Sequence, residues 1–551
     1  MWPSRERATL IVLRGLAGLR VWEGWLVPRI ALNAGNRKWW TLAAMTGAQS
    51  MLMVDATVVG LALPSIQRDL NVSTTTIQWV ISAYMLTLAA LLAIGGWLSD
   101  RIGPVRSFMT GAVVFTGGLV CSGASDPLAS IELLLAARVV QGCGAALMIP
   151  AAQSIITDAF ARDERGGAMG IWGSVSMIFM VLAPAAGGVV TQSVGWGWLF
   201  WGLIPFGVAS IVLTIYVRPV APPAEKQARF DRLGSALLVV GLVAFIFGLM
   251  QSSAWGWLDW RVIGLLVLGS LSLVGFVLVE PHRRDPLIEM RLFRSGNFGV
   301  AALIMAFIGA PATVTSIWGA RYLQDVLEFS PQAAGLALMP LSVPLLLLSI
   351  PGGRLYDKLG PRLPLGIGLG ALTVAMLFGA LALQERDYAW LVPSLVLIGI
   401  GLAFASTPAN TEGMNSAPEE LRGEAAGALQ TVGQAGNVLV VAIVTTLVDS
   451  IENAHVEIFL KRNDFGDVTA EQVEGLLAEA QGGDPSDLVN LPADQLSQLV
   501  DEVKNAFTSG VQVAYLSTAG LMAILLLLAL ARLKGRRTTP PTAPTLEESP
   551  P

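Results

Sequence analysis

Apolar residues gather in long runs along most of the chain. At a rise of 1.5 Å per residue, a helix of about 20 apolar residues crosses a hydrocarbon core about 30 Å thick. The pattern therefore predicts an all-α polytopic membrane protein. Fourteen spans are expected, at residues 41–64, 77–97, 106–124, 130–152, 166–190, 197–217, 233–251, 261–279, 297–317, 333–351, 364–383, 390–408, 424–447 and 512–532. An even number of spans places both termini on one side of the membrane.

The distribution of basic residues predicts which side that is. Most of the 35 Lys and Arg residues fall in the two tails and in every second loop, among them Arg101, Arg218 and Arg354. Cytoplasmic loops of membrane proteins are enriched in Lys and Arg. Both termini are therefore predicted to be cytoplasmic, in a multi-pass protein of the cell (inner or plasma) membrane.

Two segments outside the spans differ from simple loops. Residues 1–40 are interrupted by charges and lack the apolar core and cleavage site of a signal peptide, so a cytoplasmic leader or an interfacial segment is expected. A start codon placed too far upstream explains them equally well. Residues 449–510 form an acidic extracytoplasmic loop, in which helical periodicity at 470–480 and at 492–507 predicts one or two short helices that cap the outer face. This loop is either a passive solvated segment or an element of gating or partner binding.

Composition agrees with a membrane protein and narrows the possible chemistry. The chain of 551 residues is 54% hydrophobic and 14% charged, with a net charge of −5, whereas soluble proteins are about a quarter charged. Cys121 and Cys143 lie inside apolar runs, and the two histidines, His282 and His455, lie outside the spans. The sequence therefore predicts no metal site and no cofactor.

A nine-residue pattern occurs twice, after the second and after the tenth span. It reads G-x-L-x-D-[RK]-x-G-P at residues 96–104 and again at 353–361. Parallel repeats of this kind build one major class of transporter. Because eight spans separate the copies, the predicted organisation is 41–217 as a six-helix bundle, 218–296 as two inserted spans with linkers, and 297–532 as a second six-helix bundle. Residues 533–551 are a predicted cytoplasmic tail.

Each residue type in the repeat has a plausible physical role. Glycine lets two helices touch closely, the acid can accept hydrogen bonds from the N-terminus of a neighbouring helix, and the base can contact a facing helix or a lipid phosphate. The cluster is predicted to latch the cytoplasmic side and to break when the halves rock; the alternative is a mere tight turn. Its members are Gly96, Asp100, Arg101 and Gly103, and Gly353, Asp357, Lys358 and Gly360.

Two charged residues lie deep inside predicted spans, Asp55 in the first and Arg138 in the fourth. A charge at the bilayer centre costs at least about 2.5–3.5 kcal/mol and marks function by default. Asp55 is predicted to bind the proton and Arg138 to modulate it, with Gln141 one turn further on. The alternative is a static buried ion pair.

A substrate cavity would be lined by apolar, aromatic and uncharged polar side chains. Met and aromatic surfaces suit promiscuous binding, and cations stack on aromatic faces. Each candidate can equally be an ordinary helix-packing residue. The candidates are Met51, Tyr84, Gln141, Trp172, Met177, Met180, Gln251, Trp318, Tyr322, Gln324, Gln430 and Gln434.

Several motifs occur in an order typical of one transporter family. They are D-x-T-x-x-x-x-A-L-P at 55–64, Q-W-V at 78–80 with Tyr84, the G-x-L-x-D-R-x-G turn, R-x-x-Q-G-x-G-A-A at 138–146, and Pro184 with Gly187 and Gly188. Together they resemble the major facilitator superfamily, specifically its fourteen-span drug:proton antiporters. The resemblance implies alternating access by two six-helix bundles, with Asp55 as the proton- and substrate-linked acid, Arg138 as the buried base, and Pro184, Gly187 and Gly188 as the antiporter motif.

The sequence departs from that family's pattern in places. Ala183 precedes Pro184 where glycine is usual, Gly197 stands between Trp196 and Trp198 where arginine is usual, and Ser82 replaces an acid that some members carry. Fewer membrane acids argue against the export of polyvalent cations.

The predicted function is a proton-coupled secondary transporter that exports amphipathic drugs or toxic compounds, cationic ones included. Its expected partners are protons, small amphipathic substrates and membrane lipids, with no nucleic acid, and a monomer is expected to function. The alternative is an exporter or flippase of a lipid or secreted natural product. A membrane enzyme is disfavoured because clustered acids or histidines are missing from the sequence, an ATP-driven pump because G-x-x-x-x-G-K-[ST] is missing, and a transport-dead sensor because Asp55 is present.

Overall fold

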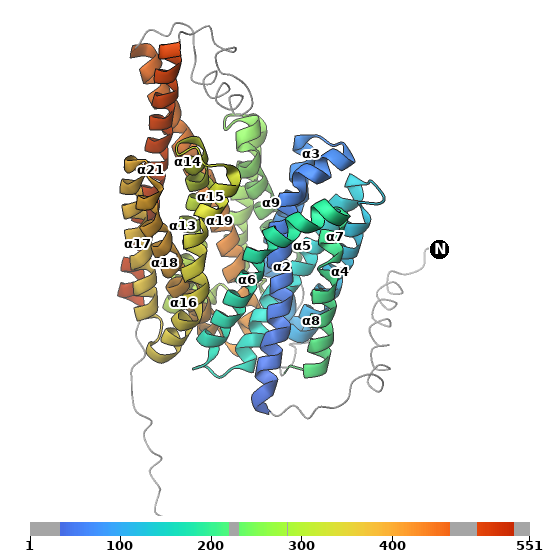
Figure 1. Ribbon diagram of the computed structural model, residues 1–551. Coiled ribbons are helices and arrows are strands. Elements are labelled where there is room, and N and C mark those ends of the chain that lie inside the picture. Colours follow the sequence, from blue (N-terminus) through green and yellow to red (C-terminus); the bar gives the residue numbers. More distant parts are fainter. Residues whose placement is uncertain (1–33, 220–230, 284, 463–492, 534–551) are drawn as a thin grey trace, which may run out of the picture.

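The computed structural model describes residues 34–219, 231–283, 285–462 and 493–533, and the regular elements in this part of the chain are all helical (Figure 1). Thirteen of the described helices are long and apolar enough to cross a membrane. The remaining predicted span, 166–190, falls within α6 (Arg165–Val194), a helix of 30 residues. The predicted all-α polytopic class is confirmed, whereas the count of fourteen spans stays a prediction.

The first group of helices covers residues 34–217. Its members are α2 (Ala34–Leu70), α3 (Thr74–Ile102), α4 (Pro104–Ala124), α5 (Ile131–Ala159), α6, α7 (Gly197–Trp201) and α8 (Ile204–Val217). α5 packs against α3 and α4, and α2 packs against α6 and α8. The predicted span 197–217 is thus two helices, with Pro205 in the first turn of α8, a position where proline is favoured because its missing N–H leaves no helix hydrogen bond unmade.

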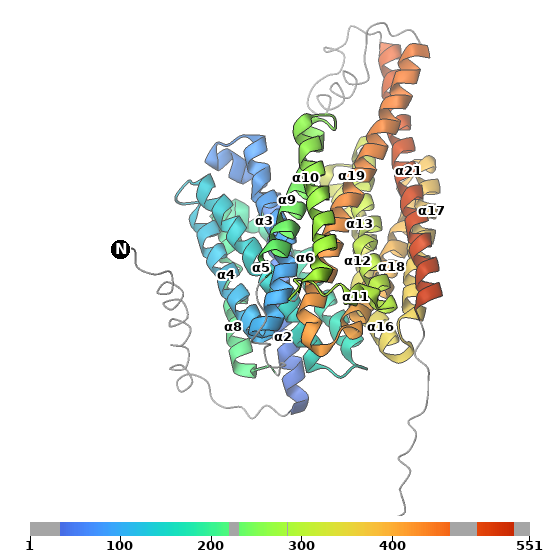
Figure 2. The same cartoon turned by 180° about the vertical axis from the view of Figure 1, so that it is seen from behind.

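Two helices form a hairpin between the groups, α9 (Arg232–Trp255) and α10 (Trp260–Val279). α9 packs against α3 and α19, while α10 packs on α9 at the periphery (Figure 2). α10 leaves large apolar side chains such as Leu271, Val274 and Leu278 exposed. Such a face is favourable only against lipid tails, because in water it would expose a large apolar patch.

The second group covers the rest of the described chain. Its members are α12 (Gly296–Phe307), α13 (Ala310–Val314), a π-helical turn (Thr315–Gly319), α14 (Ala320–Asp325), α15 (Pro331–Ala337), α16 (Met339–Leu359), α17 (Arg362–Ala382), α18 (Tyr388–Ser416), α19 (Arg422–Arg462) and α21 (Ala493–Arg532). The predicted span 297–317 is therefore interrupted at Pro311 and by the π turn, two recognised causes of helix irregularity.

The most extensive contacts between the first group of helices and the second involve two helix pairs. α3 packs along α19, and α6 packs along α16. The two G-x-L-x-D turns lie at the ends of α3 and α16, so each copy of the repeat sits at one of these contacts. We call this end of the molecule the latch face.

The acidic loop differs from the prediction of separate short helices. α19 continues to Arg462 and α21 begins at Ala493, so both helices extend past their neighbours as a two-helix stalk (Figure 1). An apolar seam of Val456, Leu460, Leu499, Val503 and Ala506 holds the stalk together. The segment predicted as a cap at 492–507 is thus mostly the first part of α21, and the other, at 470–480, lies outside the described residues, as do 1–33 and 534–551.

Candidate functional site

Asp55 and Arg138 form a buried ion pair between α2 and α5. Nη1 of Arg138 donates to Oδ2 of Asp55 at 2.7 Å. Each residue is only 1% exposed. An arginine can satisfy a buried carboxylate because its guanidinium offers several fixed N–H donors. The sequence did not show whether these side chains meet, and the structure brings them together.

Neutral groups surround the pair and hold the guanidinium in place. Arg138 Nε donates to the Val80 carbonyl at 2.8 Å, and Nη1 also donates to Gln141 Oε1 at 2.9 Å. Gln141 Nε2 donates to Asp55 Oδ1 at 3.4 Å. The guanidinium carbon lies 4.4 Å from the centre of the Tyr84 ring, a cation–π contact. Arg138 therefore keeps acceptors of its own if Asp55 becomes neutral.

The predicted cavity residues on the first group of helices lie partly within this network and partly apart from it. Met51 is fully buried and packs toward Gly207 of α8. Tyr84 and Gln141 are fully enclosed in the ion-pair network. Trp172 is nearly buried on α6.

Partly exposed side chains mark the surfaces that a cavity could use. Met177 and Met180 on α6, Gln251 on α9, and Gln430 and Gln434 on α19 are all partly exposed.

On the second group of helices, some of the predicted residues are partly exposed and others are buried in hydrogen-bonded or packed positions. Gln430 and Gln434 share a face of α19 with Asn437, whose Oδ1 accepts from Thr313 Oγ1 of α13 at 2.7 Å. Tyr322 is fully buried, and its hydroxyl donates to the Leu383 carbonyl at the end of α17.

Gln324 donates to the carbonyl of Ala320 in its own helix. Trp318 is nearly buried beneath Arg321. Asn437 and Thr313 were not predicted. Asn437 lies one helical turn from Gln434, and Thr313 lies beside the helix break at Pro311, and these positions could have indicated them.

The predicted antiporter motif packs against the helix that carries Asp55. A methyl group at Gly187 would lie 3.0 Å from Val58 Cγ1, one turn after Asp55 on α2. Glycine at this position therefore lets α6 approach α2 closely. Pro184 and Gly188 lie in α6 as well, and their side-chain surroundings lie outside the description.

The first latch joins α3 to the N-terminus of α19. Asp100 accepts hydrogen bonds from the backbone N–H groups of Gly423 and Glu424, both at 2.7 Å. Gly96 touches the Gly423 backbone so closely that a Cβ would overlap it. Arg101 Nη2 lies 3.7 Å from Glu424 Oε1. A carboxylate at this place is stabilised by the partial positive charge of the helix N-terminus.

The second latch repeats this arrangement between α16 and α6. Asp357 accepts from the backbone N–H groups of Gly166 and Gly167, both at 2.8 Å. Gly353 lies against the Gly166 backbone, again with no space for a Cβ. Lys358, the counterpart of Arg101, is exposed.

The last glycine of each copy of the repeat ends a helix in a conformation that favours glycine. Gly103 has φ +93° and Gly360 has φ +80°. Side chains with a Cβ rarely adopt such angles, whereas glycine does so freely. Glycine at these two positions lets the chain turn directly after each helix that carries a latch acid.

A second repeated element completes the latches and was missed in the sequence. R-G-x-A-x-G occurs at residues 165–170 and 422–427, at the N-termini of α6 and α19. Arg422 forms an ion pair with Asp158 of α5. Arg165 Nη1 instead donates to the amide oxygen Asn415 Oδ1 of α18 at 2.6 Å. Comparing the two halves of the sequence beyond the first repeat would have found this pattern.

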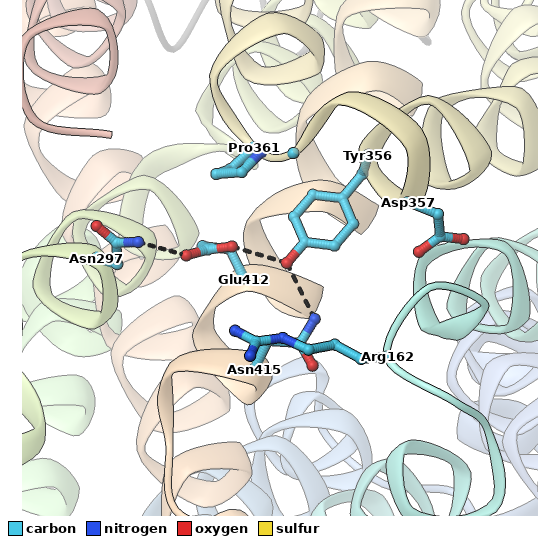
Figure 3. Close-up of a pocket in the computed structure, with 8 residues that line it drawn as sticks. Arg162, Asn297, Tyr356, Asp357, Pro361, Glu412 and Asn415 are labelled. Carbon is cyan, nitrogen blue, oxygen red and sulfur yellow. Dashed lines mark hydrogen bonds between the residues drawn. The ribbon is translucent and has the colours of Figure 1, made fainter. Parts of the chain in front are cut away.

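A buried acid on the latch face was also missed. Glu412 lies in the last turns of α18, is 7% exposed, and lies beside a cavity of about 280 Å³ (Figure 3). The predicted span ended at residue 408, so Glu412 was counted as a loop residue. The cavity is lined by Arg162, Asn297, Tyr356, Asp357, Gly360, Pro361, Glu412 and Asn415.

Comparison with known proteins decides the family. The Major Facilitator Superfamily model matches residues 45–441. The chain belongs to the Major Facilitator Superfamily. The resemblance inferred from the motifs is confirmed, and the chain is a multi-pass membrane transporter.

Curated relatives of this superfamily member carry names of resistance and export proteins. The "Tetracenomycin C resistance and export protein" of Streptomyces glaucescens is 31% identical over 89% of this chain and 90% of its own length. The "Puromycin resistance protein pur8" of Streptomyces alboniger is 34% identical over 80% of this chain and 86% of its own. The "Multidrug resistance protein Stp" of Mycobacterium tuberculosis (strain CDC 1551 / Oshkosh) is 28% identical over 77% of this chain and 78% of its own.

Solved structures of the superfamily share the fold of this chain. The proton:xylose symporter XylE, bound to 6-bromo-6-deoxy-D-glucose, has a TM-score of 0.59 at 13% identity and covers 91% of this chain and 97% of its own. The human organic anion transporter MFSD10 has a TM-score of 0.56 at 13% identity and covers 91% of this chain and all of its own. At such low identity these structures establish the fold alone.

Proposed function

We propose that this superfamily member is a proton-coupled antiporter that exports amphipathic small molecules, organic cations included, from the cytoplasm. The observation that carries the proposal is the buried ion pair of Asp55 and Arg138. The names of the curated relatives support drug export. Proton coupling rests on the chemistry of the pair.

The pair can exchange a proton without leaving the buried guanidinium of Arg138 short of hydrogen-bond acceptors. When Asp55 binds a proton, Arg138 loses one charged acceptor and keeps the Val80 carbonyl and the Gln141 side-chain oxygen, at 2.8 Å and 2.9 Å. Breaking a buried ion pair is costly mainly when one charge is left without partners. The neutral acceptors around Arg138 lower that cost. Asp55 can therefore change its protonation state during a transport cycle while its surroundings stay folded.

The two latches supply the conformational half of the mechanism. Both are closed in this structure, so the latch face is sealed by α3 against α19 and by α6 against α16. We place this face toward the cytoplasm, with both termini, because the basic loops lie there. Two six-helix units related by the repeat would rock against each other, breaking both latches as the cytoplasmic side opens. The α9–α10 hairpin is the inserted pair of spans between these units.

Inverted membrane vesicles test the proposal. Adding ethidium or puromycin to vesicles with an imposed proton gradient should dissipate the gradient if substrate and protons exchange. Asp55→Asn should abolish this exchange, whereas Asp69→Asn, which removes an exposed acid from the same helix, should leave it intact. Normal exchange by Asp55→Asn would overturn the assigned role.

A further inference from the structure

The cavity on the latch face holds a chain of hydrogen bonds that crosses from one helix group to the other. Arg165 of α6 donates to Asn415 Oδ1 at 2.6 Å. Asn415 Nδ2 lies 3.0 Å from the Tyr356 hydroxyl oxygen, to which it donates. The Tyr356 hydroxyl in turn donates to Glu412 Oε2 at 2.7 Å (Figure 3). An arginine on the first group is thus connected to a buried acid on the second.

The direction of these bonds fixes the protonation state that the closed latch prefers. Glu412 Oε1 accepts from Asn297 Nδ2 at 2.7 Å and from Ser416 Oγ at 3.3 Å, so both carboxyl oxygens already act as acceptors. Tyr356 both accepts from Asn415 and donates to Glu412. An ionised carboxylate is an acceptor only, whereas a protonated one must also donate. A proton on Glu412 turns one of these acceptors into a donor, so the Tyr356 or Ser416 hydroxyl would have to rotate to accept it; a proton on Oε2 would remove the donation from Tyr356 to Glu412 and break the chain.

The charged groups near Glu412 do not remove this dependence of the closed latch on the protonation state of Glu412. Within the described residues, no Lys or Arg nitrogen lies within ion-pair distance of Glu412, and the side chains that hydrogen-bond to its carboxylate are neutral. Arg162 lines the same cavity but is exposed, and Asp357 is bound to the backbone of α6. Arg165 donates to Asn415 Oδ1 and to the Phe160 carbonyl, so its hydrogen-bonded connection to Glu412 runs through Asn415. The neutral chain is therefore the direct connection between Glu412 and the first helix group.

We propose that Glu412 is a positioning residue for transport, whose ionised form holds the second latch closed through Tyr356 and Asn415. Tyr356 precedes Asp357, and Arg165 precedes Gly166, so the chain and the Asp357 hydrogen bonds link the same two segments. Protonation from the cytoplasm through the cavity breaks the chain and favours opening, and closing returns the proton. The direction toward the cytoplasm rests on the proposed function; the link between protonation and opening does not.

Spin labels on the latch face measure opening directly in the purified full-length chain. The native cysteines are first replaced by Cys121→Ser and Cys143→Ser. Arg106→Cys and Arg362→Cys then place labels at exposed positions early in α4 and α17, outside the hydrogen-bonded chain. Without substrate or gradient, the ratio of open to closed molecules should rise as pH falls. One linked proton contributes at most about a tenfold change per pH unit.

Two variants decide whether Glu412 is responsible. Glu412→Gln should favour the open form and reduce the pH slope by up to one proton. Tyr356→Phe, which keeps the ring and removes only the hydroxyl, should reduce the slope as well. Tyr388→Phe removes a hydroxyl that donates to the Ala337 carbonyl away from the latch face and should change nothing. Wild-type slopes in both Glu412→Gln and Tyr356→Phe would overturn the proposal, whatever the vesicle assay shows for Asp55.

Discussion

The side chains of Asp55 and Arg138 lie 83 residues apart in sequence and meet at 2.7 Å inside the first group of helices. Both are buried, so each is the other's only charged partner among the contacts described for the pair. This contact makes a buried carboxylate tolerable in a membrane span, where an unpaired charge is costly.

Removing the arginine alone should destabilise the protein more than removing both charges. Arg138→Gln leaves Asp55 buried without its cation, a change that costs about 3–5 kcal/mol in comparable pairs. Asp55→Asn together with Arg138→Gln should be less destabilising than the sum of the single changes, because no buried charge remains. Thermal unfolding of the purified variants in one detergent measures both effects. Additive losses would show that the two residues do not interact.

The latch glycines should tolerate no side chain, in contrast to a glycine in open space. Gly96→Ala and Gly353→Ala would place a methyl group against the backbones of Gly423 and Gly166. Each change should push the latch face toward the open state and reduce transport. Gly117→Ala, where nothing lies within 4 Å of the new carbon, is the matched control. Equal transport by all three variants would contradict the close approach.

The two latch acids should contribute similarly to closure because they make the same contacts. Asp100→Asn and Asp357→Asn each lose a charge that favours a helix N-terminus, an interaction worth up to about 2 kcal/mol when partly buried. Each variant should raise the open population measured with labels at positions 106 and 362. Glu420→Gln changes an exposed acid near the first latch and should have no effect. A closed latch in both Asp variants would show that the acids serve only as turn residues.

Glu280 at the end of α10 binds the backbone of the segment that follows, residues 285–290, which we call the strap. Its Oε1 accepts from the backbone N–H groups of Leu287 and Ile288, the latter at 2.9 Å. Glu424 of the first latch accepts from the Glu289 N–H at 3.3 Å. Glu280→Ala should free the strap and speed tryptic cleavage after the exposed Arg283 and Arg291.

A variant in the same strap provides the control for that cleavage assay. Glu289→Ala removes an acidic side chain but leaves the backbone N–H that binds Glu424. Because Glu289 lies 3.5 Å from Arg291, cleavage after Arg283 is the rate to compare, and it should stay near that of the wild type. Equal rates for Glu280→Ala and the wild type would show that Glu280 does not hold the strap.

The sequence predicts those features of this fold that depend on local pattern. Apolar runs locate the helices to within several residues, and the repeated turn places Asp100 and Asp357 at equivalent positions. The extent of α18, α19 and α21 could not be read in this way, because all three continue past their apolar parts into polar segments. Hydropathy ends a span at the first polar residues, whereas the backbone hydrogen bonds of a helix can continue.

The same limit explains what was missed at the site. Glu412 was assigned to a loop because the polar residues Asn410 and Thr411 precede it, although all three are buried or nearly so. The meeting of Asp55 with Arg138 and the crossing from Arg165 to Asn415 join residues far apart in the chain. Such contacts depend on how the helices pack, which one sequence does not specify.

Proton release on substrate binding tests the central claim most directly. Purified protein in weakly buffered detergent solution, mixed with a saturating substrate found in the vesicle assay, should release a proton that a pH-sensitive dye records. Wild type and Asp69→Asn should release equal amounts, and Asp55→Asn should bind the substrate with no release. Equal release from Asp55→Asn and the wild type would contradict the assignment of Asp55 as the coupling acid.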